Sequence, residues 1–261
     1  MTQEFKDKVV VVTGGSRGIG KAIAQSFARE GAQTVLAASS QENLDKAAAA
    51  IGNSGPRPLT FAADLKSLAA CEALHAFVQE KLGHCDVLVN NAGATRSGNF
   101  LELPDEAFHD GFALKYFACV RLCKLFWPML KAREGHVVNI IGGAARTPDA
   151  LFLIGGSVNS ACANFSKGLA GLGKQDGVNV NVIHPGMTET DRITTLLQQR
   201  AQASGITPDE ARKEMLAKSG LRRIGLPEDT AELALFLCSE RARHIQGAAI
   251  AVDGGQTSGL F

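Results

Sequence analysis

Short apolar runs alternate along the chain with longer amphipathic stretches. The apolar runs, which we expect to be strands, cover residues 9–13, 34–38, 58–63, 86–90, 136–141, 178–183 and 248–253. The first of them, VVVVT at 9–13, is a short, β-branched apolar run, as is expected of a strand buried on both faces. The intervening stretches carry apolar residues at helical spacing, which predicts helices over 19–31, 41–51, 68–82, 108–129, 157–172 and 231–238.

This alternation predicts an α/β fold in which a parallel sheet carries helices on both faces. The chain has 261 residues, a length that α/β folds reach as a single unit. No linker rich in proline, glycine or serine divides it, and no internal repeat is visible. We therefore expect residues 1–261 to form one domain.

Composition and charge exclude several classes of protein. Hydrophobic residues make up 45% and charged residues 20%, which indicates a globular chain. Lys and Arg number 27 against 26 Asp and Glu, so no excess of positive charge favours nucleic acid. The polar start MTQEFKDK predicts no signal peptide, and no apolar run approaches the roughly 18 residues that would span a membrane.

The six cysteines form no CxxC pair, and Cys119 and Cys123, which could face one another on a helix, have no His or acidic residue at suitable spacing nearby. Most of them fall in predicted helices, where a reduced thiol packs as a small apolar group. We therefore expect a cytoplasmic protein with reduced cysteines, no metal, and no nucleic acid or membrane as a partner.

A glycine-rich turn follows the first strand directly and leads into a helix. Its sequence, TGGSRGIG at residues 13–20, places glycines at 14, 18 and 20. Such glycines let the backbone approach a pyrophosphate, while the helix N-terminus directs free N–H groups at the same anion. The position between strand and helix is the one that this function requires, so the turn predicts dinucleotide binding.

The end of the second strand indicates which dinucleotide is bound. NAD sites have an acidic residue there to bind the ribose hydroxyls. This chain has no acid between residues 32 and 41, so a 2′-phosphate would not be repelled. Arg17 in the glycine turn is placed to pair with such a phosphate, and Ser39 and Ser40 to donate hydrogen bonds to it. The pattern favours NADP(H), with NAD(H) as the alternative.

With these features the chain closely resembles the short-chain dehydrogenase/reductase family over essentially its whole length. The turn at 13–20 matches the family's TGxxxGIG, and NNAG at 90–93 matches its segment after the fourth strand. Asp64 matches the residue that contacts adenine, PG-x-x-x-T at 185–190 matches the segment that cradles the nicotinamide amide, and 253–255 match the C-terminal DGG.

The resemblance implies a Rossmann-type, doubly wound parallel sheet of seven strands in a three-layer sandwich, with a substrate lid at about residues 187–225. It also implies a homo-oligomer, a dimer or a tetramer, assembled through the long helix and the following helix of small residues (Ala161, Ala163, Gly168 and Ala170). Together with the turn, it gives these expected cofactor-binding residues: Gly14, Ser16, Arg17, Gly18, Ile19, Gly20, Ser39, Ser40, Asp64, Leu65, Asn91, Ala92, Gly93, Asn159, Pro185, Gly186, Thr188 and Thr190.

The family's catalytic tetrad of Asn, Ser, Tyr and Lys is replaced throughout. In the aligned segments Lys115 stands at the Asn position, Gly142 at the Ser, Gly155 at the Tyr and Asn159 at the Lys. The only tyrosine of the chain, Tyr116, has no lysine four residues later, so the usual proton donor is absent from the sequence. Loss of a positioned general acid costs about 10²–10⁴-fold in rate.

Lys115 lies on an apolar helical stripe that we expect to face the cofactor cleft. In a dry cleft its pKa would fall, and it would act as an acid or bind an anionic substrate. The alternative is a packed stem with the ammonium in water. Asn159 is a candidate to bond the nicotinamide ribose in place of the lysine. We interpret Tyr116 as a packing residue, and His184 as compatible with an ordinary structural role.

The lid is basic, through Arg192, Arg200, Arg212, Lys213, Arg222 and Arg223. One interpretation is that these charges bind an anionic substrate. The other is that they lie on helix faces that are exposed to water and have no binding role. Three functions remain open for the chain. They are an oxidoreductase with an altered proton relay and a small-molecule substrate, a catalytically inactive dinucleotide-binding sensor or structural subunit, and a lyase or isomerase on the same fold.

Overall fold

The computed structural model describes residues 3–257 and contains a parallel sheet of seven strands. In space the strands follow the order β3-β2-β1-β4-β5-β6-β7. Their bounds are β1 (Val9–Thr13), β2 (Gln33–Ala38), β3 (Leu59–Ala62), β4 (Val87–Asn90), β5 (His136–Ile140), β6 (Asn179–Pro185) and β7 (Ala249–Val252). The chain winds outward from β1 to β3 and then returns to the other side of β1, which is the doubly wound topology expected.

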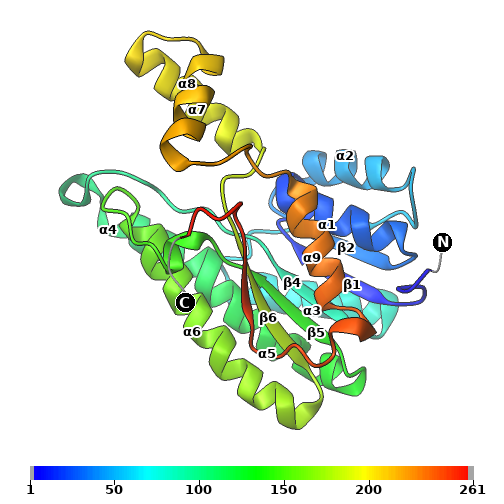
Figure 1. Cartoon of the computed structure of the whole chain (residues 1–261). Coiled ribbons are helices and arrows are strands. Elements are labelled where there is room, and N and C mark those ends of the chain that lie inside the picture. The colour runs from blue at the N-terminus through cyan, green and yellow to red at the C-terminus, as the bar shows by residue number, and fades with distance from the viewer. Residues whose placement is uncertain (1–2, 258–261) are drawn as a thin grey trace.

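Helices cover both faces of this sheet (Figure 1). Those within the described residues are α1 (Gly18–Arg29), α2 (Gln41–Ile51), α3 (Leu68–Leu82), α4 (Asp105–Gly111), α5 (Ala118–Ala132), α6 (Leu153–Asp176), α7 (Asp191–Ser204), α8 (Pro208–Ser219) and α9 (Pro227–Leu237). One core cluster joins the sheet to α1, α2 and α9, and a second joins it to α3, α5 and α6. The three-layer sandwich is therefore confirmed.

The position of β1 between two helix layers explains why its sequence is a continuous apolar run. Val10 and Val12 belong to the first core cluster, and Val9 and Val11 belong to the second. Successive side chains of a strand point to opposite faces, so a strand with helices on both sides needs an apolar residue at every position.

The structure corrects the bounds of the helix predicted over residues 108–129 and shows that it is interrupted. It begins earlier, at Asp105 directly after Pro104, and a π-helical segment, η2 (Phe112–Phe117), separates α4 from α5. The wider π turn shifts the helical register, and such segments frequently occur at functional sites. Lys115 lies within this segment.

Two other helices are longer than their sequence patterns predict. Helix α6 begins at Leu153 and ends at Asp176, because packing on the sheet supports a segment rich in glycine and serine. Helix α9 begins at Pro227 rather than near residue 231. Proline is favourable in a first helical turn, where its missing N–H would have no partner within the helix.

Helices α7 and α8 (yellow to orange in Figure 1) stand out from the sheet and enclose a small core of their own, which includes Ile193, Leu197 and Met215. The N–H of Gly225 donates to the Met187 carbonyl at 2.9 Å, so the two ends of the segment predicted as a lid meet at its base. Thr207 caps α8 in a capping box with Glu210.

All six cysteines are buried and unbridged, which confirms that they pack as small apolar groups. Across residues 3–257, no three His, Cys, Asp or Glu side chains gather as a metal site would require. No helix in the described part of the chain combines the length and apolar character needed to cross a membrane. A cytoplasmic location remains a prediction.

Candidate functional site

The glycine turn forms an open cradle at the carboxyl end of β1. Gly14 and Gly18 have φ angles of +64° and +52°, which glycine adopts at little cost. A Cβ at Gly20 would lie 2.3 Å from the carbonyl oxygen of Gly14, so no side chain fits there. No side chain caps the start of α1. Its first N–H groups therefore remain available to an anion, and the cradle fits a dinucleotide pyrophosphate.

Thr13 and Asn91 fix this turn against the end of β4. The Thr13 hydroxyl accepts hydrogen bonds from the N–H groups of Asn91 and Ala92, both at 3.0 Å. The Asn91 amide donates to the carbonyls of Thr13 and Gly14 at 3.0 and 3.2 Å. Asn91, expected at the cofactor, thus holds the turn in shape.

The residues expected to bind the adenosine half lie at the same edge of the sheet. Arg17 is exposed, and its guanidinium lies 3.4 Å from the Asp191 carboxylate at the start of α7. Ser40 caps α2 by accepting a hydrogen bond from the Asn43 N–H at 3.3 Å. Asp64 follows β3 and accepts from the Lys66 N–H at 3.1 Å. Chain elements far apart in sequence thus bring these residues together, because the carboxyl ends of parallel strands share an edge.

The segment after β6 approaches the glycine turn from the other side. A Cβ at Gly18 would lie 3.1 Å from Cγ2 of Thr190. Gly186 packs against Asp253, because a Cβ there would lie 2.7 Å from the Asp253 Cα. The Thr188 hydroxyl donates to the Gly186 carbonyl at 3.0 Å and so stabilises the bend that leads into the lid.

Lys115 points inward, as the helical stripe predicted. Its methylene stem lies over Gly93, where a Cβ would come within 2.9 Å of the lysine Cδ. It lines a cavity of about 10 Å³ together with Asn90, Ala92, Cys119, Asn139, Ile140, Ile141 and Cys162. Burial lowers the pKa of the Lys115 ammonium, and the charge of Arg192 lowers it further. The site therefore holds an ammonium that releases its proton more readily than an exposed lysine does.

Gly142 and Asn159, which the sequence predicts at two of the tetrad positions, bond to one another. The buried Asn159 accepts a hydrogen bond through Oδ1 from the Gly142 N–H at 3.0 Å. A Cβ at Gly142 would lie 3.2 Å from the Asn159 Nδ2. Asn159 therefore holds the loop after β5.

Another side chain fills the space beside Gly155, the residue that the sequence predicts at the tyrosine position. A Cβ at Gly155 would lie 2.1 Å from two carbons of the Phe152 ring, so this ring occupies the space that a larger residue would take. The Arg192 guanidinium lies 5.2 Å from the centre of the same ring. Sequence analysis missed Phe152 and named Arg192 only as one of six basic residues of the predicted lid. The only sequence signal at this place was Gly155, which leaves room for a ring without specifying one.

His184 and Tyr116 have structural roles, which confirms their interpretation from sequence. His184 is buried, and its Nδ1 lies 2.7 Å from the Ile141 carbonyl, so Nδ1 carries the proton. Burial lowers its pKa. Tyr116 packs among the rings of Phe112, Phe117 and Phe165, with centroid distances of 6.1, 5.3 and 6.3 Å.

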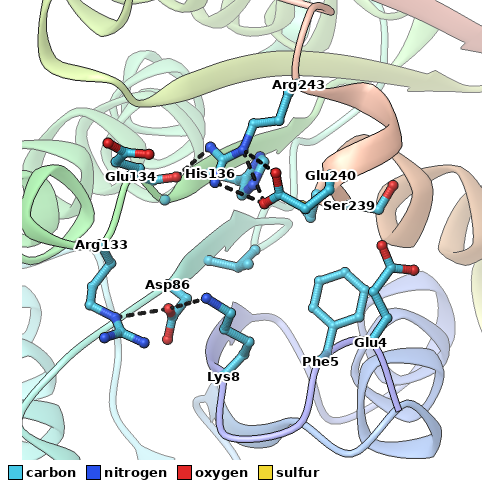
Figure 2. Close-up of a pocket in the computed structure, with 13 residues that line it drawn as sticks. Glu4, Phe5, Lys8, Asp86, Arg133, Glu134, His136, Ser239, Glu240 and Arg243 are labelled. Atoms are coloured by element: carbon cyan, nitrogen blue, oxygen red, sulfur yellow. Dashed lines mark hydrogen bonds and ion pairs between the residues drawn. The ribbon is translucent and has the colours of Figure 1, made fainter. Parts of the chain in front are cut away.

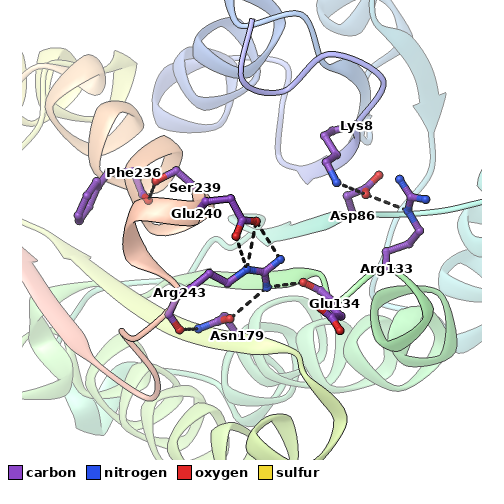
Figure 3. A network of polar contacts seen from close by, with 9 residues as sticks. All are labelled: Lys8, Asp86, Arg133, Glu134, Asn179, Phe236, Ser239, Glu240 and Arg243. Carbon is purple, nitrogen blue, oxygen red and sulfur yellow. Dashed lines mark hydrogen bonds and ion pairs between the residues drawn. The ribbon is translucent and has the colours of Figure 1, made fainter. Parts of the chain in front are cut away.

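A larger cavity, of about 80 Å³, lies at the opposite edge of the sheet (Figure 2). Asp86 there pairs with Lys8 at 3.2 Å and with Arg133 at 3.0 Å. Figure 3 shows Arg243 bonded to Glu240 and to Asn179 in the same network. Ligands of open α/β sheets bind outside the carboxyl ends of the strands. This cavity lies at the other ends, and we assign it to structural ion pairing.

His136, which lines that cavity, predicts a dependence of stability on pH. Burial lowers its pKa to about 4, with a further effect from Arg243. In the unfolded chain the pKa is near 6.5, so between these values the unfolded state binds a proton that the folded state does not. The free energy of unfolding should therefore fall by about 2 kcal/mol from this group between pH 7 and pH 5.

Urea titrations at both pH values, on wild type and on His136→Leu, would measure this contribution. Other buried histidines act in the same direction, so the difference between the two proteins isolates His136. An equal loss of stability in both proteins would contradict the assignment.

An open parallel sheet with a glycine cradle between β1 and α1 defines a Rossmann-type dinucleotide-binding protein. Residues 8–201 match the family model described as short chain dehydrogenase. The chain belongs to the short-chain dehydrogenase family.

Named relatives span nearly the full length of the chain. The 7alpha-hydroxysteroid dehydrogenase of Bacteroides fragilis is 32% identical, covering 97% of this chain and 95% of its own. The 3-oxoacyl-[acyl-carrier-protein] reductase FabG of Escherichia coli is also 32% identical, covering 96% and 98%. The structure of L-sorbose reductase from Gluconobacter frateurii, complexed with NADPH and L-sorbose, has a TM-score of 0.95 at 33% identity and covers all of both chains.

Proposed function

We propose that this protein is an NADP(H)-dependent oxidoreductase of a small carbonyl or hydroxy compound, in which Lys115 serves as the proton donor and acceptor. The observation that carries the proposal is the inward Lys115 ammonium in a cleft whose usual tyrosine, serine and lysine are replaced. Full-length similarity to oxidoreductases of one family supports it.

The chain's own residues fit the dinucleotide, whose nicotinamide supplies the two-electron redox chemistry when bound. The glycine cradle of residues 14–20 would hold the pyrophosphate. Asp64 and Leu65 would contact the adenine, and the segment from Pro185 to Thr190 the nicotinamide amide. Asn159 has its Oδ1 bonded to Gly142, so its Nδ2 is the atom that would reach the nicotinamide ribose. Solved relatives complexed with NADPH and with NADH support this assignment.

Lys115 donates and accepts the proton of the reaction. In the reducing direction its Nζ gives a proton to the carbonyl oxygen of the substrate, and in the oxidising direction the neutral amine takes a proton from the hydroxyl. A lowered pKa brings both protonation states closer to neutral pH, where general acid–base catalysis is most effective. The stem of Lys115 packs on Gly93, which limits the positions that Nζ can take.

Two measurements test this function. The first is a titration with NADPH, and the second is a screen of carbonyl compounds at high enzyme concentration that follows NADPH consumption. Binding with turnover supports the proposal, and absence of NADPH binding would overturn it.

A second candidate, a dinucleotide-binding protein without turnover, is favoured by one observation. The Phe152 ring fills the place of the tyrosine, as it would in a site that had lost catalysis. Tight NADPH binding with no turnover of any carbonyl compound, in wild type and variants alike, would favour this second reading.

Cofactor preference gives a further prediction. Arg17→Ala should weaken NADPH binding at least about tenfold, because a charge-assisted hydrogen bond to a phosphate is lost, and should weaken NADH binding much less. Fluorescence titration with both cofactors measures the two changes. Equal losses for NADPH and NADH would show that Arg17 does not bind the 2′-phosphate.

We further propose that the protein is a dimer or a tetramer assembled through α5 and α6. Gly168 and Leu172 lie one turn apart on an outer face of α6, and a Cβ at Gly168 would meet no atom within 4 Å. Phe117 and Leu172 expose 46% and 44% of their surface. Ala170, expected at this contact, instead packs in the chain's own core and is corrected to a core residue.

Light scattering at micromolar concentration should therefore give an oligomer for the wild type. Leu172→Glu should shift the population toward smaller species, because it places a charge on the contact face. A monomeric wild type at that concentration would contradict the assembly.

A further inference from the structure

Lys115 is a half-buried lysine that lines a cavity without a carboxylate partner. The cavity lies at the carboxyl ends of β4 and β5, and the stem of Lys115 packs beside it on Gly93. Lys8, which lines the larger cavity, pairs with Asp86 at 3.2 Å, whereas no carboxylate in residues 3–257 pairs with Lys115. Burial without an opposite charge favours the neutral form of an amine, so Lys115 differs from Lys8 in its chemistry.

The groups around this cavity do not supply an anion near neutral pH. Apart from Lys115, the lining side chains belong to asparagine, cysteine, alanine and isoleucine residues. Burial raises the pKa of the Cys162 thiol to about 11. A hydrogen bond with Cys123, together with burial, raises the pKa of the Cys119 thiol. Both thiols therefore remain protonated, and neither would hold Lys115 in its charged form.

Asn90 places an unused hydrogen-bond acceptor at the same cavity. Its Nδ2 donates to Oδ1 of Asn139 at 2.8 Å and to Sγ of Cys123 at 3.4 Å, which orients the amide. Only 8% of Asn90 is exposed, and its Oδ1 is buried without a partner in the described part of the chain. A buried polar atom without a partner is costly. The site therefore favours a ligand that brings an O–H or N–H group next to Lys115.

A neutral amine in these surroundings is a nucleophile as well as a base. A lysine that is desolvated in a pocket, or that lies near another cation, attacks carbonyl carbons and forms Schiff bases. The cavity of about 10 Å³ admits one group of the size of a water molecule, such as the oxygen of a carbonyl compound. Lys115 and Asn90 would then contact the reacting carbon and its oxygen, respectively.

We infer that Lys115 also condenses with small aldehydes and forms a Schiff base at Nζ. The Nζ lone pair bonds to the carbonyl carbon, the C=O π pair moves to the oxygen, and a proton passes from nitrogen to oxygen. The resulting carbinolamine loses its hydroxyl and the last N–H proton as water, and a C=N bond forms without net oxidation or reduction. Oδ1 of Asn90 accepts a hydrogen bond from the carbinolamine hydroxyl.

The inference rests on the proposed function only in placing a carbonyl group at Lys115. It requires neither NADPH nor hydride transfer. A protonated Schiff base withdraws electrons from the neighbouring carbon more strongly than a carbonyl group does. Such an intermediate would give this fold a route to lyase or isomerase chemistry that needs no tyrosine.

Reductive trapping on the full chain would test the inference. The probe is acetaldehyde with sodium cyanoborohydride at pH 7, without a dinucleotide. The reagent reduces a Schiff base to a stable ethylamine, and peptide mass spectrometry gives the labelling rate of each lysine. The internal comparison is Lys124, an exposed lysine of α5, and the variants are Lys115→Met and Lys124→Met.

We expect Lys115 to be labelled at least about tenfold faster than Lys124, because only about one exposed lysine in 10³ is neutral at pH 7. Lys115→Met should lose the fast label, and Lys124→Met should retain it. Labelling of Lys115 no faster than that of Lys124 in wild type would overturn the inference. Both rates come from one protein, so this outcome does not depend on how a variant folds.

NADPH consumption tests the oxidoreductase proposal separately. Fast labelling of Lys115, with no carbonyl compound causing NADPH consumption, would support the Schiff base and contradict the oxidoreductase. Consumption of NADPH that requires Lys115, with slow labelling of this residue, would support the proton donor and overturn the Schiff base.

Discussion

Lys115→Met is expected to lower the turnover number at least about 100-fold and to leave NADPH affinity nearly unchanged. Methionine keeps the length of the apolar stem that packs on Gly93, but it removes the ammonium. The proton for the carbonyl oxygen would then have to come from water, which is the loss expected when a general acid is removed. Steady-state kinetics on a verified substrate and a direct NADPH titration measure the two quantities.

Two control variants distinguish the loss of the proton donor from the loss of the positive charge. Lys115→Arg keeps a positive charge that does not deprotonate near neutral pH, so its turnover should stay low even where substrate binding is retained. Lys124→Met changes an exposed lysine of α5 and should behave as wild type. Full turnover in Lys115→Met would show that the proton donor is another group.

Rebuilding the family's site should have the opposite effect, but only when Phe152 is removed. Gly142→Ser, Gly155→Tyr and Asn159→Lys place a serine, a tyrosine and a lysine at the positions that the sequence predicts for them. In the structure, however, the Phe152 ring lies 2.1 Å from where the tyrosine Cβ would be. We expect the triple variant to gain no activity and to lose about 1–3 kcal/mol of stability through overpacking.

Adding Phe152→Ala to the three changes opens the space for the tyrosine. The quadruple variant should raise carbonyl reductase activity about 10²-fold or more above the triple variant, within the range for a positioned general acid. Phe152→Ala alone serves as the control for the effect of the cavity. NADPH consumption and thermal melting, measured on all three variants, test this expectation. Full activity and wild-type stability in the triple variant would contradict the steric role of Phe152.

Much of the fold and the frame of the cofactor site could be predicted from sequence because both depend on local patterns. A strand between two helix layers must be apolar at every position, so the strands were predicted to within about two residues, as β1 shows. The glycine turn could be predicted equally well, because a Cβ at Gly20 would lie 2.3 Å from the Gly14 carbonyl oxygen, so only glycine fits there. The lack of a Tyr-x-x-x-Lys motif required only a search of the sequence for tyrosine.

Tertiary structure decided which side chains lie at the positions that the sequence predicts for the tetrad. A glycine in a sequence shows that a side chain is missing, but not which group moves into the space, and here that group is Phe152. Asn159 faces Gly142, and Arg192 reaches Phe152 from a separate helix, through contacts 17 and 40 residues apart in sequence. The π-helical segment at Lys115 likewise leaves no periodic signal. Sequence by itself therefore determined the sheet and the cofactor cradle, whereas only the packing of distant elements determined which side chains lie at Gly142 and Gly155.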